Sequence, residues 1–101
     1  KNFQTPIIKK NRTSAWAQYT FRVKKREDLQ LKLKENGIPT SIFYPLPLDR
    51  QRCFKYLNYK LKDFPVSEKA SREVLSLPMN PFFTNKQIDY IINKVLKSKI
   101  S

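Results

Sequence analysis

Residues 37–48 read Gly37-Ile38-Pro39-Thr40-Ser41-Ile42-Phe43-Tyr44-Pro45-Leu46-Pro47-Leu48, and the other segments can be arranged around them. They include the only glycine of the chain and three of its seven prolines. The glycine predicts the end of a helix, and residues 40–44 predict a short strand. Proline fixes its own φ and keeps the preceding residue extended, so the two later prolines predict a stiff loop. We therefore expect Tyr44 at the end of a strand, in a loop of the kind that often carries binding residues. The alternative is a simple exit from an edge strand.

The composition favours one small folded domain with a basic surface. The chain has 101 residues, of which 40% are hydrophobic and 13% aromatic, and this is enough for a modest core. Twenty-one lysines and arginines against eight acidic residues give a net charge of +13, and there is no histidine. Such a charge favours anionic partners: nucleic acid, an acidic membrane or a phosphorylated small molecule. The basic residues are scattered along the chain, however, which is typical of a solvated surface.

The cysteine content and the hydropathy pattern exclude several kinds of site. Because Cys53 is the single cysteine, an internal disulfide and a cysteine zinc site are excluded. Its neighbours Phe54 and Leu57 predict that the thiol is a small buried apolar group. No run approaches the roughly 20 apolar residues of a membrane span, and no apolar signal region follows Lys1. Since the chain does not begin with methionine, we expect that it has been cut from a longer polypeptide.

Two strands are expected near the amino terminus. Residues 1–12 read as a connector with one edge strand, and residues 14–23 as the clearest strand of the chain. Alternate positions of the second segment would face the core, namely Ala15, Ala17, Tyr19, Phe21 and Val23. Trp16 falls on the opposite face, where we expect another segment or a partner surface to cover it.

Residues 24–36 fit both a strand and a helix, since leucine occurs there at three alternate positions. Two acidic residues in the first turn favour a helix, as does Gly37 at the position of a left-handed cap. Ile38 can then pack back on Leu33, the hydrophobic contact that accompanies such a cap. We expect a helix with Leu29 and Leu33 facing the core.

After the proline loop, residues 49–57 predict a short helix with Asp49 as its N-cap. Ser67 is a good N-cap for a further helix that extends to about residue 74. A short strand is expected at residues 75–77, because prolines follow it closely.

The last helix has the strongest local signals. Thr84 and Gln87 form a capping-box pair, and Phe83 with Ile88 has the spacing of a hydrophobic staple. An apolar stripe follows at helical spacing and predicts a core-facing side, formed by Ile88, Ile91, Ile92, Val95 and Leu96. The alternative is that this stripe meets another surface of a longer parent protein. Together these elements predict an α+β fold, with a small antiparallel or mixed sheet of about three strands and three to four helices.

We find no catalytic constellation in the sequence. Without histidine there is no Ser-His or Cys-His dyad, and one glycine cannot form a glycine-rich phosphate loop. The few carboxylates do not cluster as an acid–base pair or a metal site. The residues alone therefore indicate a small basic domain that is not an enzyme by itself, with no catalytic, cofactor or metal ligands in the chain.

The order of several motifs is more informative than any one of them. These are Ser14-Ala15-Trp16-Ala17-Gln18-Tyr19-Thr20-Phe21, Gly37-Ile38-Pro39-Thr40, Tyr44-Pro45-Leu46-Pro47-Leu48 with Gln51, Phe64-Pro65-Val66-Ser67-Glu68, Ser76-Leu77-Pro78-Met79-Asn80-Pro81-Phe82 and Thr84-x-x-Gln87-Ile88. In this order and spacing, residues 5–95 resemble the C-terminal small domain of the DegT/DnrJ/EryC1/StrS aminotransferases. Members of this family are pyridoxal-phosphate enzymes that aminate nucleotide-linked keto-sugars.

The resemblance implies a specific organisation. The fold would be that of the small domain of the aspartate-aminotransferase fold, with residues 1–13 as the connector from a large domain and residues 14–101 as the small domain. The large domain would hold pyridoxal phosphate on its Schiff-base lysine, whose motif has no match in this chain. The parent would be a cytoplasmic homodimer that takes a nucleotide sugar and an amino-acid donor, with no membrane partner. The small domain would close the active site and help to bind the substrate.

The resemblance also suggests four substrate-binding residues, which are Phe43, Tyr44, Asp49 and Gln51. Tyr44 matches the family's tyrosine before the proline and could offer a hydroxyl and a ring face to the substrate. Phe43 stands where some members have histidine, so a hydrogen bond from that position is lost. Asp49 stands where many members have histidine, and a carboxylate near a diphosphate is unfavourable. Gln51 matches the family and could either bind substrate or hold the loop.

Two other hypotheses remain open. One is a free-standing nucleic-acid-binding module, in which aromatic rings stack on bases beside a basic groove. Its affinity would fall steeply with salt, whereas an aminotransferase fragment would bind nucleic acid weakly at most, so nucleic acid is not the expected partner. The other is a nonenzymatic paralogue of the aminotransferases that serves in regulation or assembly.

Overall fold

In the computed structural model, residues 3–98 are described. A three-stranded antiparallel sheet has the order β1-β2-β3 and is built from β1 (Phe3–Gln4), β2 (Tyr19–Val23) and β3 (Val74–Leu77). Three α-helices accompany it, namely α1 (Arg26–Glu35), α2 (Pro65–Glu73) and α3 (Asn85–Lys97). Two short 3-10 helices, η1 (Leu48–Arg50) and η2 (Arg52–Leu57), follow the proline loop. The predicted α+β class and the antiparallel arrangement are confirmed.

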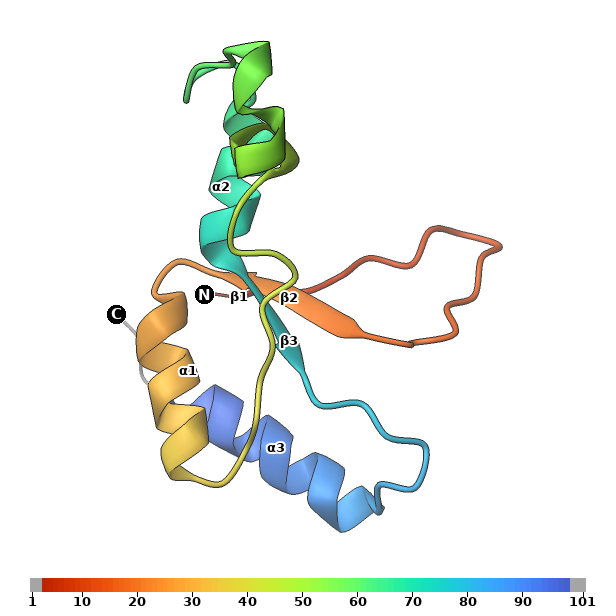
Figure 1. Cartoon of the computed structure of the whole chain (residues 1–101). Helices are drawn as coiled ribbons and strands as arrows, with labels where there is room; N and C mark the ends of the chain where they lie inside the picture. Colours follow the sequence, from red (N-terminus) through yellow and green to blue (C-terminus); the bar gives the residue numbers. More distant parts are fainter. Residues whose placement is uncertain (1–2, 99–101) are drawn as a thin grey trace.

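The core lies where α1 and α3 meet the sheet (Figure 1). Its buried side chains are Phe21, Val23, Leu29, Leu33, Ile38, Leu75 and Val95. Leu29 and Leu33 are 0% and 1% exposed, so the predicted inward face of α1 is confirmed. In Figure 1, α2 and the 3-10 helices lie together at the opposite end of the molecule from α1 and α3. The molecule therefore has a packed body and a projecting arm.

The end of α1 forms the predicted glycine cap. Gly37 has a φ of +75°, in the left-handed region that favours glycine. The Ile38 N–H donates to the Leu33 carbonyl at 2.9 Å, and the Gly37 N–H donates to the Lys34 carbonyl at 3.0 Å. These two bonds define a Schellman motif, and Ile38 joins Leu33 in the core as expected. The chain is thereby turned from α1 back across the sheet.

The start of α3 confirms the predicted capping box. The Gln87 N–H donates to Thr84 Oγ1 at 3.2 Å, and the Thr84 N–H donates to Gln87 Oε1 at 2.9 Å. The apolar stripe that follows is only partly core. Val95 is buried and Ile91 packs against the core, whereas Ile92 is 46% exposed. The prediction that the whole stripe faces the core is therefore wrong.

Two predicted strands are wrong in length. Of residues 14–23, only Tyr19–Val23 forms a strand, because Trp16 has a left-handed φ of 48° that interrupts the extended chain. Its N–H donates to Ser14 Oγ at 3.1 Å, a local turn that competes with sheet pairing. Residues 40–44 form only one bridge, between Ser41 and Ser76. The flanking prolines lack the N–H that a longer ladder needs.

The predictions for residues 49–75 also need correction. The helix expected over residues 49–57 is two 3-10 segments, divided at Gln51 by an extended ψ of 142°. Asp49 lies inside η1 and is not its N-cap. Helix α2 begins at Pro65 rather than after Ser67, since proline is well suited to the first helical position. Cys53 lies in η2, a segment with no buried residue, and it is exposed. The prediction of a buried thiol is therefore wrong.

Within residues 3–98, no helix has the length and apolar character needed to cross a bilayer. The edge strand expected in residues 1–12 is present as β1.

Candidate functional site

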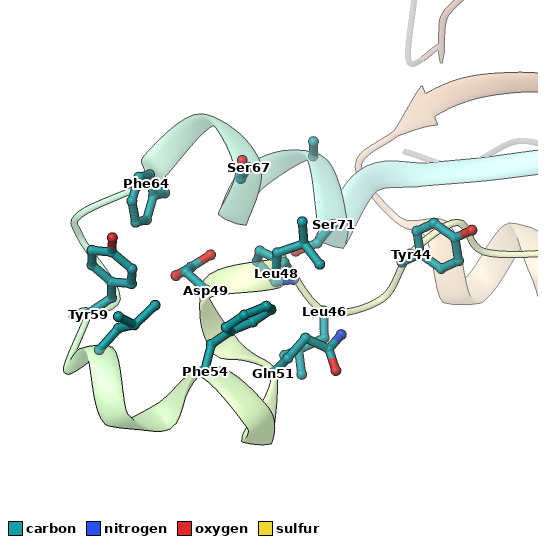
Figure 2. Close-up of a pocket in the computed structure, with 13 residues that line it drawn as sticks. Tyr44, Leu46, Leu48, Asp49, Gln51, Phe54, Tyr59, Phe64, Ser67 and Ser71 are labelled. Atoms are coloured by element: carbon teal, nitrogen blue, oxygen red, sulfur yellow. The ribbon is translucent and has the colours of Figure 1, made fainter.

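A cleft of about 700 Å³ opens in the arm, between the proline loop and α2. One wall is formed by the loop with η1 and η2, and the other by α2 and the residue that precedes it (Figure 2). The lining residues are Tyr44, Leu46, Pro47, Leu48, Asp49, Gln51, Phe54, Leu57, Tyr59, Phe64, Ser67, Ala70 and Ser71. Most of this surface is apolar, and a few hydroxyl, amide and carboxylate groups are set into it. This is the usual composition of a small-molecule site.

Three of the four predicted site residues line this cleft. They are Tyr44, Asp49 and Gln51. Figure 2 shows Tyr44 at the end nearest the sheet with its hydroxyl directed away from Asp49, which lies farther along toward Tyr59. Phe43 is not part of the lining; its ring meets that of Tyr44 edge-on, with 5.4 Å between the centroids. The structure therefore brings together the loop residues but leaves Phe43 outside.

Local sequence explains how the loop presents these side chains. Pro47 is the extended residue that precedes η1, and its carbonyl accepts from the Arg50 N–H at 3.0 Å. One 3-10 turn then carries Asp49 into the cleft, and the chain straightens again at Gln51. The peptide bond between Phe43 and Tyr44 is cis. The tyrosine is 69% exposed, so its ring and hydroxyl are open to a ligand or to another surface.

Sequence reasoning missed the opposite wall. Ser67 and Ser71 lie four residues apart on α2 and therefore share one face of the helix. Tyr59 and Phe64 form an edge-to-face pair with centroids 4.9 Å apart, which closes the far end of the cleft. The spacing of the small residues on α2 was a usable signal. The aromatic pair was not, because the loop between these residues has no periodicity.

A network of charges fixes the arm. Glu68 Oε1 accepts from Arg50 Nη1 at 2.8 Å and from Arg72 Nη1 at 3.1 Å. At the base of the arm, the Arg26 side chain is buried and its Nη1 donates to the Ser71 carbonyl. Arg22 pairs with Glu73 at 2.9 Å between β2 and the end of α2. The Arg26 and Arg22 contacts join residues 45 and 51 positions apart, so no local pattern in the sequence could indicate them.

The likeness to known proteins is extensive in sequence. The profile of the DegT/DnrJ/EryC1/StrS aminotransferase family matches residues 1–96. The chain is 45% identical over 91 residues to a pleiotropic regulatory protein of Geobacillus stearothermophilus, covering 90% of this chain and 24% of the relative. It is 42% identical over 87 residues to the UDP-2-acetamido-2-deoxy-3-oxo-D-glucuronate aminotransferase of Pseudomonas aeruginosa, covering 86% of this chain and 23% of that enzyme. The chain thus spans about a quarter of the length of these curated relatives.

Solved structures give the same result. A DegT DnrJ EryC1 StrS aminotransferase from Brucella abortus superimposes with a TM-score of 0.83 at 34% identity, covering 93% of this chain and 25% of that one. S. venezuelae DesV, solved in complex with a ketimine intermediate, shares the fold with a TM-score of 0.91 at 24% identity, covering all of this chain and 28% of DesV. From the match over residues 1–96 and these relatives, the chain belongs to the DegT/DnrJ/EryC1/StrS aminotransferase family.

Proposed function

We propose that this chain is the small domain of a longer nucleotide-sugar aminotransferase, with residues 1–13 as the connector and residues 14–101 as the domain. Family membership supports this, as do the relatives, which are about four times as long. The names of the Pseudomonas aeruginosa relative and of an Aneurinibacillus thermoaerophilus relative specify UDP- and dTDP-linked sugars. We propose the same class of substrate, a nucleotide-linked keto-sugar, together with an amino-acid donor, a cytoplasmic location and a homodimeric whole enzyme.

One observation carries the assignment of the site. Tyr44 and Gln51, which match the family motif, and Asp49, which stands where many members have histidine, line a single cleft together with α2. We propose that Tyr44 offers its ring face and hydroxyl to the sugar or base, and that Gln51 orients the loop or binds through its amide. A carboxylate repels a diphosphate, so Asp49 is better suited to accept hydrogen bonds from sugar hydroxyls. Phe43 would support the Tyr44 ring without touching the substrate.

The cleft does not have the groups that pyridoxal phosphate needs. Its lining includes no lysine to form a Schiff base and no basic side chain for the phosphate. We therefore place the cofactor, which supplies the carbanion chemistry of amino transfer, in the part of the protein outside this chain. The contribution of this chain is to bind and orient the substrate and to exclude water from the reacting group.

The test is the Tyr44→Phe variant of the longer polypeptide that contains this chain. Loss of one hydrogen bond should raise KM for the nucleotide keto-sugar roughly threefold to tenfold and leave KM for the amino donor unchanged. Tyr56→Phe is the matched control, since Tyr56 is 74% exposed and lies outside the cleft. Amination would be followed by mass spectrometry of the nucleotide sugar. Equal KM values in the two variants would exclude a hydrogen bond from the Tyr44 hydroxyl to the substrate.

A nonenzymatic regulatory paralogue is the second candidate, and the name of the Geobacillus stearothermophilus relative favours it. Such a protein would keep the cleft but would not aminate any keto-sugar nucleotide. With a net charge of +13, it could instead bind nucleic acid, with an affinity that falls steeply as salt rises. Amination by the whole protein, combined with weak and nonspecific nucleic-acid binding, would exclude this candidate.

A further inference from the structure

One ion pair joins the two walls of the cleft. Arg50, at the end of η1, pairs with Glu68 in the first turn of α2, and the nitrogen and oxygen are 2.8 Å apart. Of the ion pairs described for residues 3–98, this is the one that connects the loop wall to α2. The contact is long-range, since the two residues are 18 positions apart.

The Glu68 carboxylate is largely buried and is held by more than one contact. The side chain is only 14% exposed, and its Oε1 also accepts from Arg72, one turn later on the same helix. The other carboxylate oxygen, Oε2, is buried without a hydrogen-bond partner. The two arginines therefore share the neutralisation of this carboxylate, Arg50 from the loop wall and Arg72 from the same helix.

Because Arg50 is held by Glu68, its position in the chain also restrains the residues beside it that line the cleft. Arg50 stands between Asp49 and Gln51, which both line the cleft. With its guanidinium held by Glu68, the backbone of η1 is fixed at a set distance from α2. Freeing the guanidinium would allow the wall that carries Asp49 and Gln51 to move away from Ser67 and Ser71.

We propose that the Arg50–Glu68 ion pair sets the width of the cleft, so that both are positioning residues for the nucleotide-sugar substrate. This inference rests on the proposed function for the identity of the substrate. Neither Arg50 nor Glu68 contacts the ligand. The pair acts by positioning Asp49 and Gln51, the residues on either side of Arg50. The expected consequence is a change in substrate KM rather than in the rate of the chemical step.

The chain offers a matched control. Arg72 bonds to the same carboxylate oxygen as Arg50, but from within α2, and its side chain is 64% exposed. Arg72→Gln and Arg50→Gln remove the same charge from the same acceptor. Only Arg50→Gln disconnects the two walls.

The experiment compares Arg50→Gln, Arg50→Lys and Arg72→Gln in the longer polypeptide. Arg50→Gln should raise KM for the nucleotide keto-sugar roughly threefold to tenfold, with kcat and the donor KM nearly unchanged. Arg50→Lys should restore part of the loss, because it keeps the charge but not the planar fork. Arg72→Gln should resemble the parent. The same three proteins would be examined by hydrogen exchange without substrate, where only Arg50→Gln should speed amide exchange in residues 46–57.

The two readouts separate the possible failures. If the unmodified protein aminates keto-sugars but Arg50→Gln and Arg72→Gln have the same KM, the positioning role is overturned while the proposed function stands. If the unmodified protein aminates nothing, the proposed function fails, and hydrogen exchange alone decides whether the ion pair holds the cleft. Equal exchange in the two glutamine variants then overturns the inference, and faster exchange in Arg50→Gln supports it.

Discussion

Gly37 has a defined structural role that no other residue type fills equally well. Its φ of +75° ends α1 and directs the chain into the stretch that leads to Tyr44. A Cβ at this position would meet no atom within 4 Å, so space is not the constraint. The constraint is the backbone conformation itself, which costs a side-chain-bearing residue about 1 kcal/mol.

Gly37→Ala should therefore lower the free energy of unfolding of this chain by about 1 kcal/mol, through backbone strain alone. Gly37→Asn should lower it less, since asparagine tolerates the left-handed region. Urea denaturation of the three proteins, followed by circular dichroism, measures the difference. An alanine variant as stable as the parent would show that the Schellman cap contributes nothing.

At this scale, the sequence predicted local roles well and nonlocal ones poorly. Gly37, Leu29 and Leu33 were placed correctly because caps and helical faces depend on neighbours within one or two turns. Cys53 was placed incorrectly, because its exposure depends on how the whole arm folds. The burial of Arg26 was missed, since its partner carbonyl in α2 is 45 residues away.

Among the elements, α3 is the one whose start is best specified by its own sequence. Both hydrogen bonds of its capping box are formed, and Phe83 and Ile88 line the same apolar groove beside it. The 3-10 segments of the arm are the opposite case. The extended Gln51 divides residues 48–57, whose composition favours a continuous helix. Strand lengths were overestimated for a similar reason, because one local turn at Trp16 outweighs an alternating pattern.

Thr84→Ala should lower the free energy of unfolding by about 1 kcal/mol, because the Gln87 N–H loses its acceptor at the helix start. Thr13→Ala is the matched control, since Thr13 is exposed in the segment between β1 and β2. Thermal denaturation of both variants against the parent measures the two effects. Similar losses in the two variants would contradict a capping role for Thr84.

At the scale of the molecule, many large apolar side chains of residues 3–98 are exposed to solvent. Ile88, Ile92 and Leu96 of α3 are 41%, 46% and 66% exposed and line an apolar groove of about 480 Å³. In the arm, Tyr44 and Leu48 are 69% and 74% exposed. The predicted stripe on α3 was therefore correct in pattern but is only half covered. Its periodicity could not show which part of it would lie against this chain's own core.

Only part of the cleft could be predicted from the sequence. Motif order identified the family and three residues of one wall, because these lie within eight positions of one another. The other wall, and the Arg50–Glu68 pair that joins the walls, required the fold.

The central claim is that this chain acts as the small domain of a larger aminotransferase, and the intact mass of the polypeptide in its source cell tests it most directly. We predict a mass about four times 12.1 kDa, as expected if the chain is 24% of the whole protein, as in its Geobacillus stearothermophilus relative. Mass spectrometry of the purified natural protein would give this value. A natural polypeptide of 12.1 kDa would contradict the claim, since the part expected to hold the cofactor would then be absent.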